Sequence, residues 1–135
     1  MSGENLEVIK RGLDAVNRGD LAAAMATCAD DVVLVVDERV VSLNAGVFTG
    51  RDAVGDWFAD WFRSFAGGYQ FHIQEMRPIG KRVFLVLRHR GRGRSSGVVL
   101  EWSVAYVYAI KAGKIARIEL FSDLSDALKA VGPEK

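Results

Sequence analysis

Apolar residues recur every three or four positions in the first half of the chain and every two positions in most of the second half. The first pattern is that of an amphipathic helix, and it begins with Leu6, Ile9, Leu13 and Val16. Gly19 ends this helix. The Asp20 carboxylate can then cap a short alanine-rich helix from Leu21 to about Cys28.

A β-branched run and an aromatic helix follow. Asp30-Asp31 marks a turn into Val32–Val36, which is typical of a buried strand. Residues 37–50 are less regular, and Asn44-Ala45-Gly46 is the expected turn. From Arg51 to Phe65 we predict a third helix with one broad apolar face, formed by Val54, Trp57, Phe58, Trp61, Phe62 and Phe65.

The second half predicts a meander of four strands, at Tyr69–Met76, Lys81–Arg90, Val98–Ile110 and Ile115–Phe121. The turns between them are short, which favours antiparallel pairing. A last helix near Asp123 to Val131 ends at the stop signal Gly132-Pro133. With neither a linker nor a repeat, residues 1–135 are expected to form one α+β domain.

Composition narrows the class of protein. Half of the 135 residues are apolar and only two are prolines, which indicates a folded core. One cysteine excludes an internal disulfide, and two histidines give no metal-ligand cluster, so we expect neither a metal nor a cofactor. No apolar run approaches the ~18 residues of a membrane span, and no signal peptide pattern is present. We therefore expect a cytoplasmic protein without a membrane partner.

The net charge of +1 offers no general case for binding nucleic acid. The segment Arg88–Arg94 is basic, but it lacks interleaved aromatic residues for base stacking and has the pattern of a hairpin. A solvated or dimer-facing edge is the favoured interpretation. Its arginines could also pair with Glu101 or Glu119 on neighbouring strands.

Several motifs, in this order, resemble the nuclear transport factor 2-like superfamily and specifically its SnoaL-like bacterial branch. They are Ala15-Val16-Asn17-Arg18-Gly19-Asp20, Cys28-Ala29-Asp30-Asp31-Val32, Phe48-Thr49-Gly50-Arg51-Asp52-Ala53-Val54, Gly113-Lys114-Ile115, and Ser122-Asp123 with the tail Ala127–Gly132. The resemblance implies a cone, in which a curved mixed or antiparallel sheet wraps around the N-terminal helices and encloses a pocket. It also implies a homodimer, commonly formed through the outer face of the sheet.

The resemblance does not bring a reaction with it, because the family holds enzymes and binders alike. The positions of the ketosteroid isomerase set hold Gly12, Val36 and Tyr106. Asp37 is one residue off, and only a bulge would turn it into the pocket. The positions of the limonene epoxide hydrolase set hold His89, Leu87, Leu120, Leu34 and Val36. Neither set is present.

Period-two alternation then gives the expected pocket wall. It consists of Leu34, Val36, Leu87, His89, Trp102, Val104, Tyr106, Ile118 and Leu120 from the strands, with Trp61 from the third helix. His89 is the candidate general base, since an apolar pocket favours its neutral form, and Tyr106 is the candidate donor to a developing oxyanion. The structural alternative is a core histidine bonded to the backbone beside a packed tyrosine. His72 is expected at the surface and Cys28 as a buried, inert thiol.

Two functions remain open at this point. The first is an isomerase, cyclase or hydratase that needs no cofactor and acts on a small hydrophobic molecule through His89 and Tyr106. The second is a non-catalytic domain that binds such a molecule or a partner, because Val, Leu and Gly fill most positions of the known catalytic sets.

Overall fold

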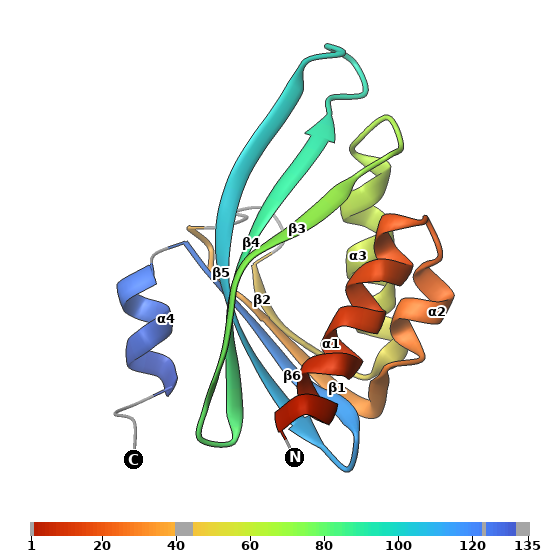
Figure 1. Ribbon diagram of the computed structural model, residues 1–135. Helices are drawn as coiled ribbons and strands as arrows, with labels where there is room; N and C mark the ends of the chain where they lie inside the picture. Colours follow the sequence, from red (N-terminus) through yellow and green to blue (C-terminus); the bar gives the residue numbers. More distant parts are fainter. Residues whose placement is uncertain (1, 40–44, 123, 132–135) are drawn as a thin grey trace.

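A curved six-stranded sheet carries helices on both of its faces (Figure 1). The computed structural model describes residues 2–39, 45–122 and 124–131. Three helices cover the concave face, and one covers part of the opposite face. They are α1 (Ser2–Asn17), α2 (Leu21–Met25) and α3 (Arg51–Arg63) on the concave side, and α4 (Leu124–Val131) on the other. The expected α+β cone is thus confirmed.

The strand order is β2-β1-β6-β5-β4-β3. The bounds are β1 Cys28–Val36, β2 Gly46–Thr49, β3 Gln70–Ile79, β4 Arg82–Arg92, β5 Val99–Lys111 and β6 Lys114–Phe121. Consecutive strands from β3 to β6 pair antiparallel, as the short turns predicted, and β1 pairs antiparallel with β2. Among the described strands, only the pair of β1 and β6 runs parallel. The sheet is therefore mixed.

Side chains fix the ends of the N-terminal helices. The Asp20 carboxylate accepts a hydrogen bond from the Ala23 N–H at 3.0 Å, which confirms the expected cap of α2. At the end of α1, the Asn17 side-chain amide donates to the Phe71 carbonyl at 2.9 Å and accepts from the Phe71 N–H at 2.8 Å. This pair of bonds ties α1 to the start of β3.

Several boundaries differ from the sequence prediction. β1 begins at Cys28 rather than Val32, so Asp30-Asp31 lies within a strand; the irregularity of its pairing with β6 falls between Cys28 and Val33. α2 ends at Met25, and α3 ends at Arg63 before a loop in which Gly67 and Gly68 both take positive φ. The expected residues Asn44, Asp123 and Gly132-Pro133 lie outside the described part of the chain.

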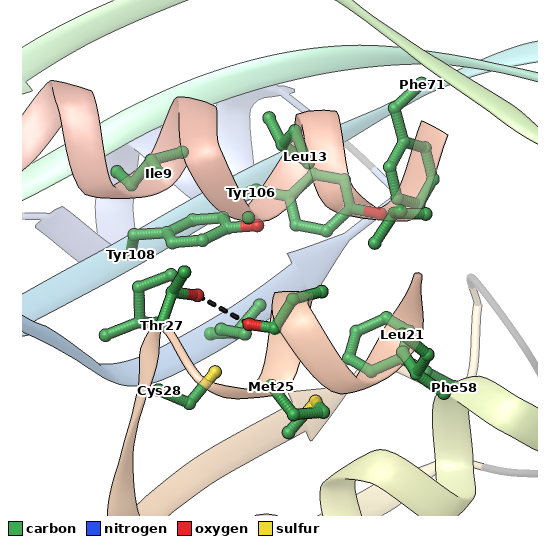
Figure 2. Close-up of a pocket in the computed structure, with 15 residues that line it drawn as sticks. Ile9, Leu13, Leu21, Met25, Thr27, Cys28, Phe58, Phe71, Tyr106 and Tyr108 are labelled. Carbon is green, nitrogen blue, oxygen red and sulfur yellow. Dashed lines mark hydrogen bonds between the residues drawn. The ribbon is translucent and has the colours of Figure 1, made fainter. Parts of the chain in front are cut away.

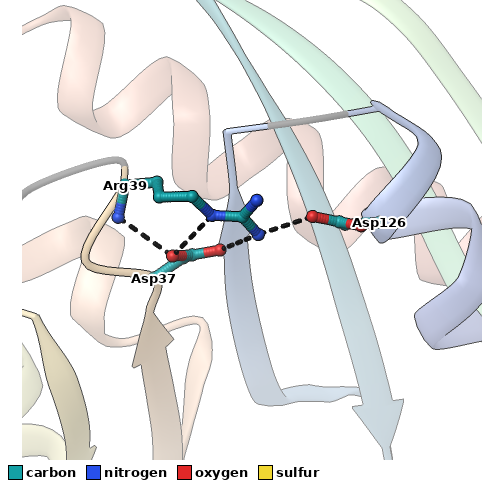
Figure 3. Close-up of polar contacts among 3 residues, drawn as sticks. All are labelled: Asp37, Arg39 and Asp126. Carbon is teal, nitrogen blue, oxygen red and sulfur yellow. Dashed lines mark hydrogen bonds and ion pairs between the residues drawn. The ribbon is translucent and has the colours of Figure 1, made fainter.

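A second, smaller core lies under α4. Ala127, which is fully buried, packs with Phe84, Ala105 and Val107 on the outer face of the sheet. Beside it, the Arg39 guanidinium contacts the carboxylates of Asp37 at 2.9 Å and Asp126 at 2.5 Å (Figure 3). This contact joins the segment after β1 to α4.

Asp37 takes part in the contact with Arg39 and Asp126 beside α4. Its hydrogen bonds from Arg39 lower the pKa of the carboxyl group. No irregularity of the β1 pairing occurs at Val36, where the register with β2 and β6 is regular. The bulge that would have turned Asp37 into the pocket is therefore not present in the described strand.

Among the described helices, none combines the length and the hydropathy required to cross a bilayer.

Candidate functional site

The concave face of the sheet brings His89 to the centre of an aromatic row. In the strand register His89 lies opposite Phe71 of β3 on one side and opposite Trp102 of β5 on the other. Alternation along β4 turns His89 inward and turns Arg88 and Arg90 outward. The three neighbouring strands therefore present one histidine between two aromatic side chains, on the face that the helices cover.

Both ring nitrogens of His89 are hydrogen-bonded to tyrosines. The Tyr69 hydroxyl oxygen lies 2.6 Å from Nδ1, and the Tyr106 hydroxyl oxygen lies 2.9 Å from Nε2. Tyr69 immediately precedes β3, whereas Tyr106 lies within β5. The three side chains form a continuous hydrogen-bonded chain, which we call the Tyr69–His89–Tyr106 chain.

The chain is enclosed by rings. His89 is 4% exposed, its ring stacks on those of Trp102 and Tyr106, and Phe71 contacts it edge-on at a centroid distance of 4.6 Å. Burial lowers the pKa of His89 to about 3. The ring is therefore neutral near pH 7, as the sequence suggested, and it is also a weak base.

The two tyrosines are held in their neutral forms as well. Burial raises the pKa of Tyr69 and raises that of Tyr106 well above its usual range. Each member of the chain thus resists a change of charge at neutral pH. The geometry favours the orientation of hydrogen bonds over the transfer of protons.

Two small cavities adjoin the chain. One, of about 20 Å³, lies between α3 and the sheet and is lined by Trp57, Phe58, Trp61, Phe71, His89, Trp102, Val104, Tyr106 and Leu120. The other, of about 40 Å³, lies between α1, α2 and the sheet (Figure 2). Its lining is almost wholly apolar, and it includes Ile9, Leu13, Met25, Cys28, Tyr106 and Tyr108. Tyr106 lines both cavities.

A larger cleft of about 270 Å³ lies beside the second cavity. It is lined by Val16, Gly19, Leu21, Ala59, Phe62, Gly67, Gly68 and Tyr69. Val16 and Leu21 also line the 40 Å³ cavity, and Phe58 and Phe71 line both inner cavities. The three spaces therefore form a row from the cleft to His89, and neighbouring spaces share side chains as walls.

The structure brings together most of the residues that the sequence singled out. His89, Tyr106, Trp102, Val104, Leu120 and Trp61 all line the 20 Å³ cavity, and Ile118 lines the 40 Å³ cavity. Leu34, Val36 and Leu87 are buried in the adjoining core without lining either one. His72 is exposed, as expected.

Sequence reasoning missed Tyr69 and Tyr108. Tyr69 lies two positions before Phe71 on the same face, so period two from Phe71 could have placed it beside His89. Tyr108 continues the inward series of β5 beyond Tyr106. The contributions of α1, such as Ile9 and Leu13, needed the helix-to-sheet packing, which the alternation of the strands does not reveal.

Two further expectations, which concern residues outside the Tyr69–His89–Tyr106 chain, are confirmed. Cys28 is buried, and burial raises the pKa of its thiol. On the outer face, Glu101 pairs with Arg88 at 2.8 Å and with Arg90 at 3.2 Å. These cross-strand pairs account for two of the hairpin arginines. Among the described residues, no group of histidine, cysteine and carboxylate side chains could hold a metal ion.

Comparison with known proteins identifies the family of the chain and other structures with the same fold. The model of the SnoaL-like domain family matches residues 9–118. No curated protein sequence matches the chain. TerC, crystallised with polyporic acid, shares 17% identity over 96% of this chain and 99% of its own, with a TM-score of 0.78. A Mycobacterium tuberculosis protein in complex with estradiol-17beta-hemisuccinate shares 20% identity over 90% of this chain and 95% of its own, with a TM-score of 0.74. A putative polyketide cyclase from Sinorhizobium meliloti shares 23% identity over 85% of this chain and 94% of its own, with a TM-score of 0.69.

Proposed function

Because the chain belongs to the SnoaL-like domain family, we propose that it binds a small hydrophobic molecule between its concave sheet and helices α1–α3. One observation carries the proposal. The cleft and the two inner cavities form a row that leads to the Tyr69–His89–Tyr106 chain, and the row is lined mainly by apolar side chains. Such a lining with a few convergent polar groups is typical of small-molecule sites.

The volumes indicate how the ligand is accommodated. By the same measure a single water needs ~10–15 Å³, so cavities of 20 and 40 Å³ hold only a few atoms. The cleft, at 270 Å³, is the space that receives most of the ligand. Movement of Val16 and Leu21, the walls shared by the cleft and the larger inner cavity, would join the two spaces.

Two structural neighbours support an apolar ligand that carries oxygen. One was crystallised with polyporic acid and another with an estradiol ester. Both compounds combine an extended hydrophobic body with oxygen atoms. In this chain the polar groups that line the two inner cavities include His89, Tyr106 and Tyr108.

Catalysis is the second candidate function, and the contact between His89 and Tyr106 is the observation that favours it. In that case Tyr106 would donate to a substrate oxygen while His89 acts as acid or base. The occupied ring nitrogens and the low pKa of His89 favour binding over proton transfer. A His89-dependent turnover of any carbonyl compound would favour catalysis over binding alone.

A thermal-shift series with a matched pair of variants tests the binding proposal. Ala24 lines the 40 Å³ cavity, and Ala22 lies on the exposed side of the same helix. A panel of aromatic ketones, hydroxyquinones and steroids is expected to raise the Tm of the wild type and of Ala22→Leu, because a ligand at 100 Kd adds ~2.7 kcal/mol. Ala24→Leu fills the cavity and should lose that shift.

Two results would contradict the proposal. One is a panel in which no compound stabilises the wild type. The other is an Ala24→Leu variant that responds to the compounds as strongly as Ala22→Leu does.

The homodimer implied by the family resemblance is also part of the proposal. The strands β3, β4 and β5 leave outward residues such as Arg88, Arg90 and Glu101 exposed beyond α4. Sedimentation of the wild type tests it, and a monomer at micromolar concentration would contradict it.

A further inference from the structure

The Tyr69–His89–Tyr106 chain contains one more donor proton than it has hydrogen bonds. A neutral imidazole carries one N–H, and each tyrosine carries one O–H, which makes three protons for two hydrogen bonds. One hydroxyl proton is therefore left to point away from His89. The tautomer of His89 decides which tyrosine keeps it.

The lengths of the two hydrogen bonds favour one of the two directions. The 2.6 Å between the Tyr69 oxygen and Nδ1 is typical of a bond donated by a hydroxyl group, whereas the 2.9 Å between the Tyr106 oxygen and Nε2 is typical of a bond donated by an N–H group. Among the described residues, the other rings in contact with Tyr69 offer its hydroxyl proton no conventional acceptor; they are those of Trp61, Phe62, Phe65, Phe71 and Trp102. The Tyr69 hydroxyl therefore donates to Nδ1 of His89.

The remaining steps follow from that choice. Once Nδ1 accepts from Tyr69, the ring proton of the neutral His89 lies on Nε2. The Nε2–H group then donates to the Tyr106 oxygen at 2.9 Å. The Tyr106 hydroxyl keeps its own proton, and Tyr106 lines both inner cavities.

We propose that the hydrogen bonds from Tyr69 to His89 and from His89 to Tyr106 turn the Tyr106 hydroxyl into a dedicated donor toward the inner cavities. The site then selects an apolar ligand whose buried end carries a hydrogen-bond acceptor, such as a ketone oxygen. Tyr69 acts as a positioning residue, because it sets the direction of the His89–Tyr106 hydrogen bond, in which it takes no part. This inference rests on the proposed binding function for its ligand. The direction of the hydrogen bonds in the Tyr69–His89–Tyr106 chain can be measured without a ligand.

The direction is tested on the free protein by NMR. Long-range ¹H–¹⁵N spectra distinguish the protonated from the bare ring nitrogen, and the chain holds only one other histidine, His72. A His72→Gln sample assigns the signals. The expected result is a proton on Nε2 of His89 at pH 7, and a proton on Nδ1 would overturn the proposal.

Two ring replacements test the part played by Tyr69. Tyr69→Phe removes the hydroxyl that donates to Nδ1, and with it the preference for a proton on Nε2. The population of the Nδ1–H tautomer should then rise. Trp102→Phe is the control, since it removes an indole that stacks on His89 at 5.3 Å, and it should leave the tautomer unchanged. An equal response of both variants would contradict a positioning role for Tyr69.

A pair of ligands tests the chemical selectivity. Acetophenone and ethylbenzene differ by a carbonyl in place of a methylene group. The ratio of their affinities is expected to fall about tenfold in Tyr106→Phe, the loss of one hydrogen bond of ~1.4 kcal/mol.

The outcomes separate this inference from the proposed function. If neither probe binds while the proton lies on Nε2, the binding function fails and the direction of the chain stands. If both probes bind and their ratio is the same in the wild type and in Tyr106→Phe, the cavity is a binding site and the selectivity proposed for Tyr106 is wrong.

Discussion

The backbone of Gly91 lies against the ring of Tyr69. A Cβ atom at Gly91 would stand 2.8 Å from Cδ2 of Tyr69 and 2.9 Å from Cδ1 of Phe65. Real Cβ contacts are essentially never this short, so the tyrosine ring occupies space that only a glycine leaves free. The position of Tyr69, and with it the hydrogen bond to Nδ1 of His89, therefore depends on a residue without a side chain.

We expect Gly91→Ala to destabilise the fold by ~1–3 kcal/mol, as overpacking of a filled core does. The variant should also weaken the Tyr69–His89 bond and raise the Nδ1–H population of His89. Gly93→Ala is the control, because its Cβ meets the Ser96 hydroxyl, the end of a small side chain that can rotate away. Urea unfolding and NMR measure the two effects, and equal stability of the two variants would contradict the packing argument.

Stability should fall as the pH is lowered from 7.5 to 5 because of His89. Its pKa is about 3 in the folded chain, against ~6.5 when unfolded, so over this range only the unfolded state takes up the proton. Protons therefore favour unfolding, by about 2 kcal/mol at pH 5. Urea unfolding at both pH values should show the loss in the wild type and in His72→Gln, but not in His89→Gln. A pH dependence that persists in His89→Gln would assign it to another group.

The attachment of α4 should depend on its apolar contact rather than on its ion pairs. Ala127 is fully buried against the outer face of the sheet, and Ala127→Asp would bury an unpaired carboxylate there. We expect this change to lower the Tm by several degrees. Arg39→Ala removes an exposed contact that is screened by water, so it should leave the Tm nearly unchanged. Differential scanning calorimetry compares the two, and the opposite order would overturn the assignment.

The link between α1 and β3 should depend on both atoms of the Asn17 amide. Asn17→Asp keeps an acceptor for the Phe71 N–H but loses the donor to the Phe71 carbonyl. We expect a cost of about 1–3 kcal/mol, because a part-buried carbonyl is left without its partner. Asn17→Ala loses both bonds and should cost more. Equal unfolding free energies for the wild type and both variants would exclude this role.

Local patterns were sufficient to predict the order of the elements and the inward face of the sheet. The alternation in β4 and β5 placed His89, Trp102, Val104 and Tyr106 on one face, and the structure gathers them around one cavity. The parallel pairing of β1 with β6 is different, since it joins residues about 85 positions apart and leaves no local trace in the sequence. The same holds for Ile9 and Leu13, which reach the site only through helix packing.

Partners of buried polar groups were harder to predict. The sequence suggested a backbone group as the alternative partner of His89, whereas two tyrosine side chains take that place. Tyr69 reaches His89 from the residue before a strand, and its position depends on the loop with Gly67 and Gly68. Likewise Phe84 and Val107 point outward from the sheet, and only the packing of α4 accounts for their burial.

The arrangement around His89 also makes the protein its own optical reporter. The chain holds three tryptophans, and all three line the 20 Å³ cavity: Trp57, Trp61 and Trp102. Trp57 stacks on Trp61 at a centroid distance of 6.0 Å, and Trp61 lies 6.3 Å from Trp102. Nearly all ultraviolet emission of the chain thus originates in the walls of one site. A molecule that enters there alters the light from every indole at once, without an attached dye.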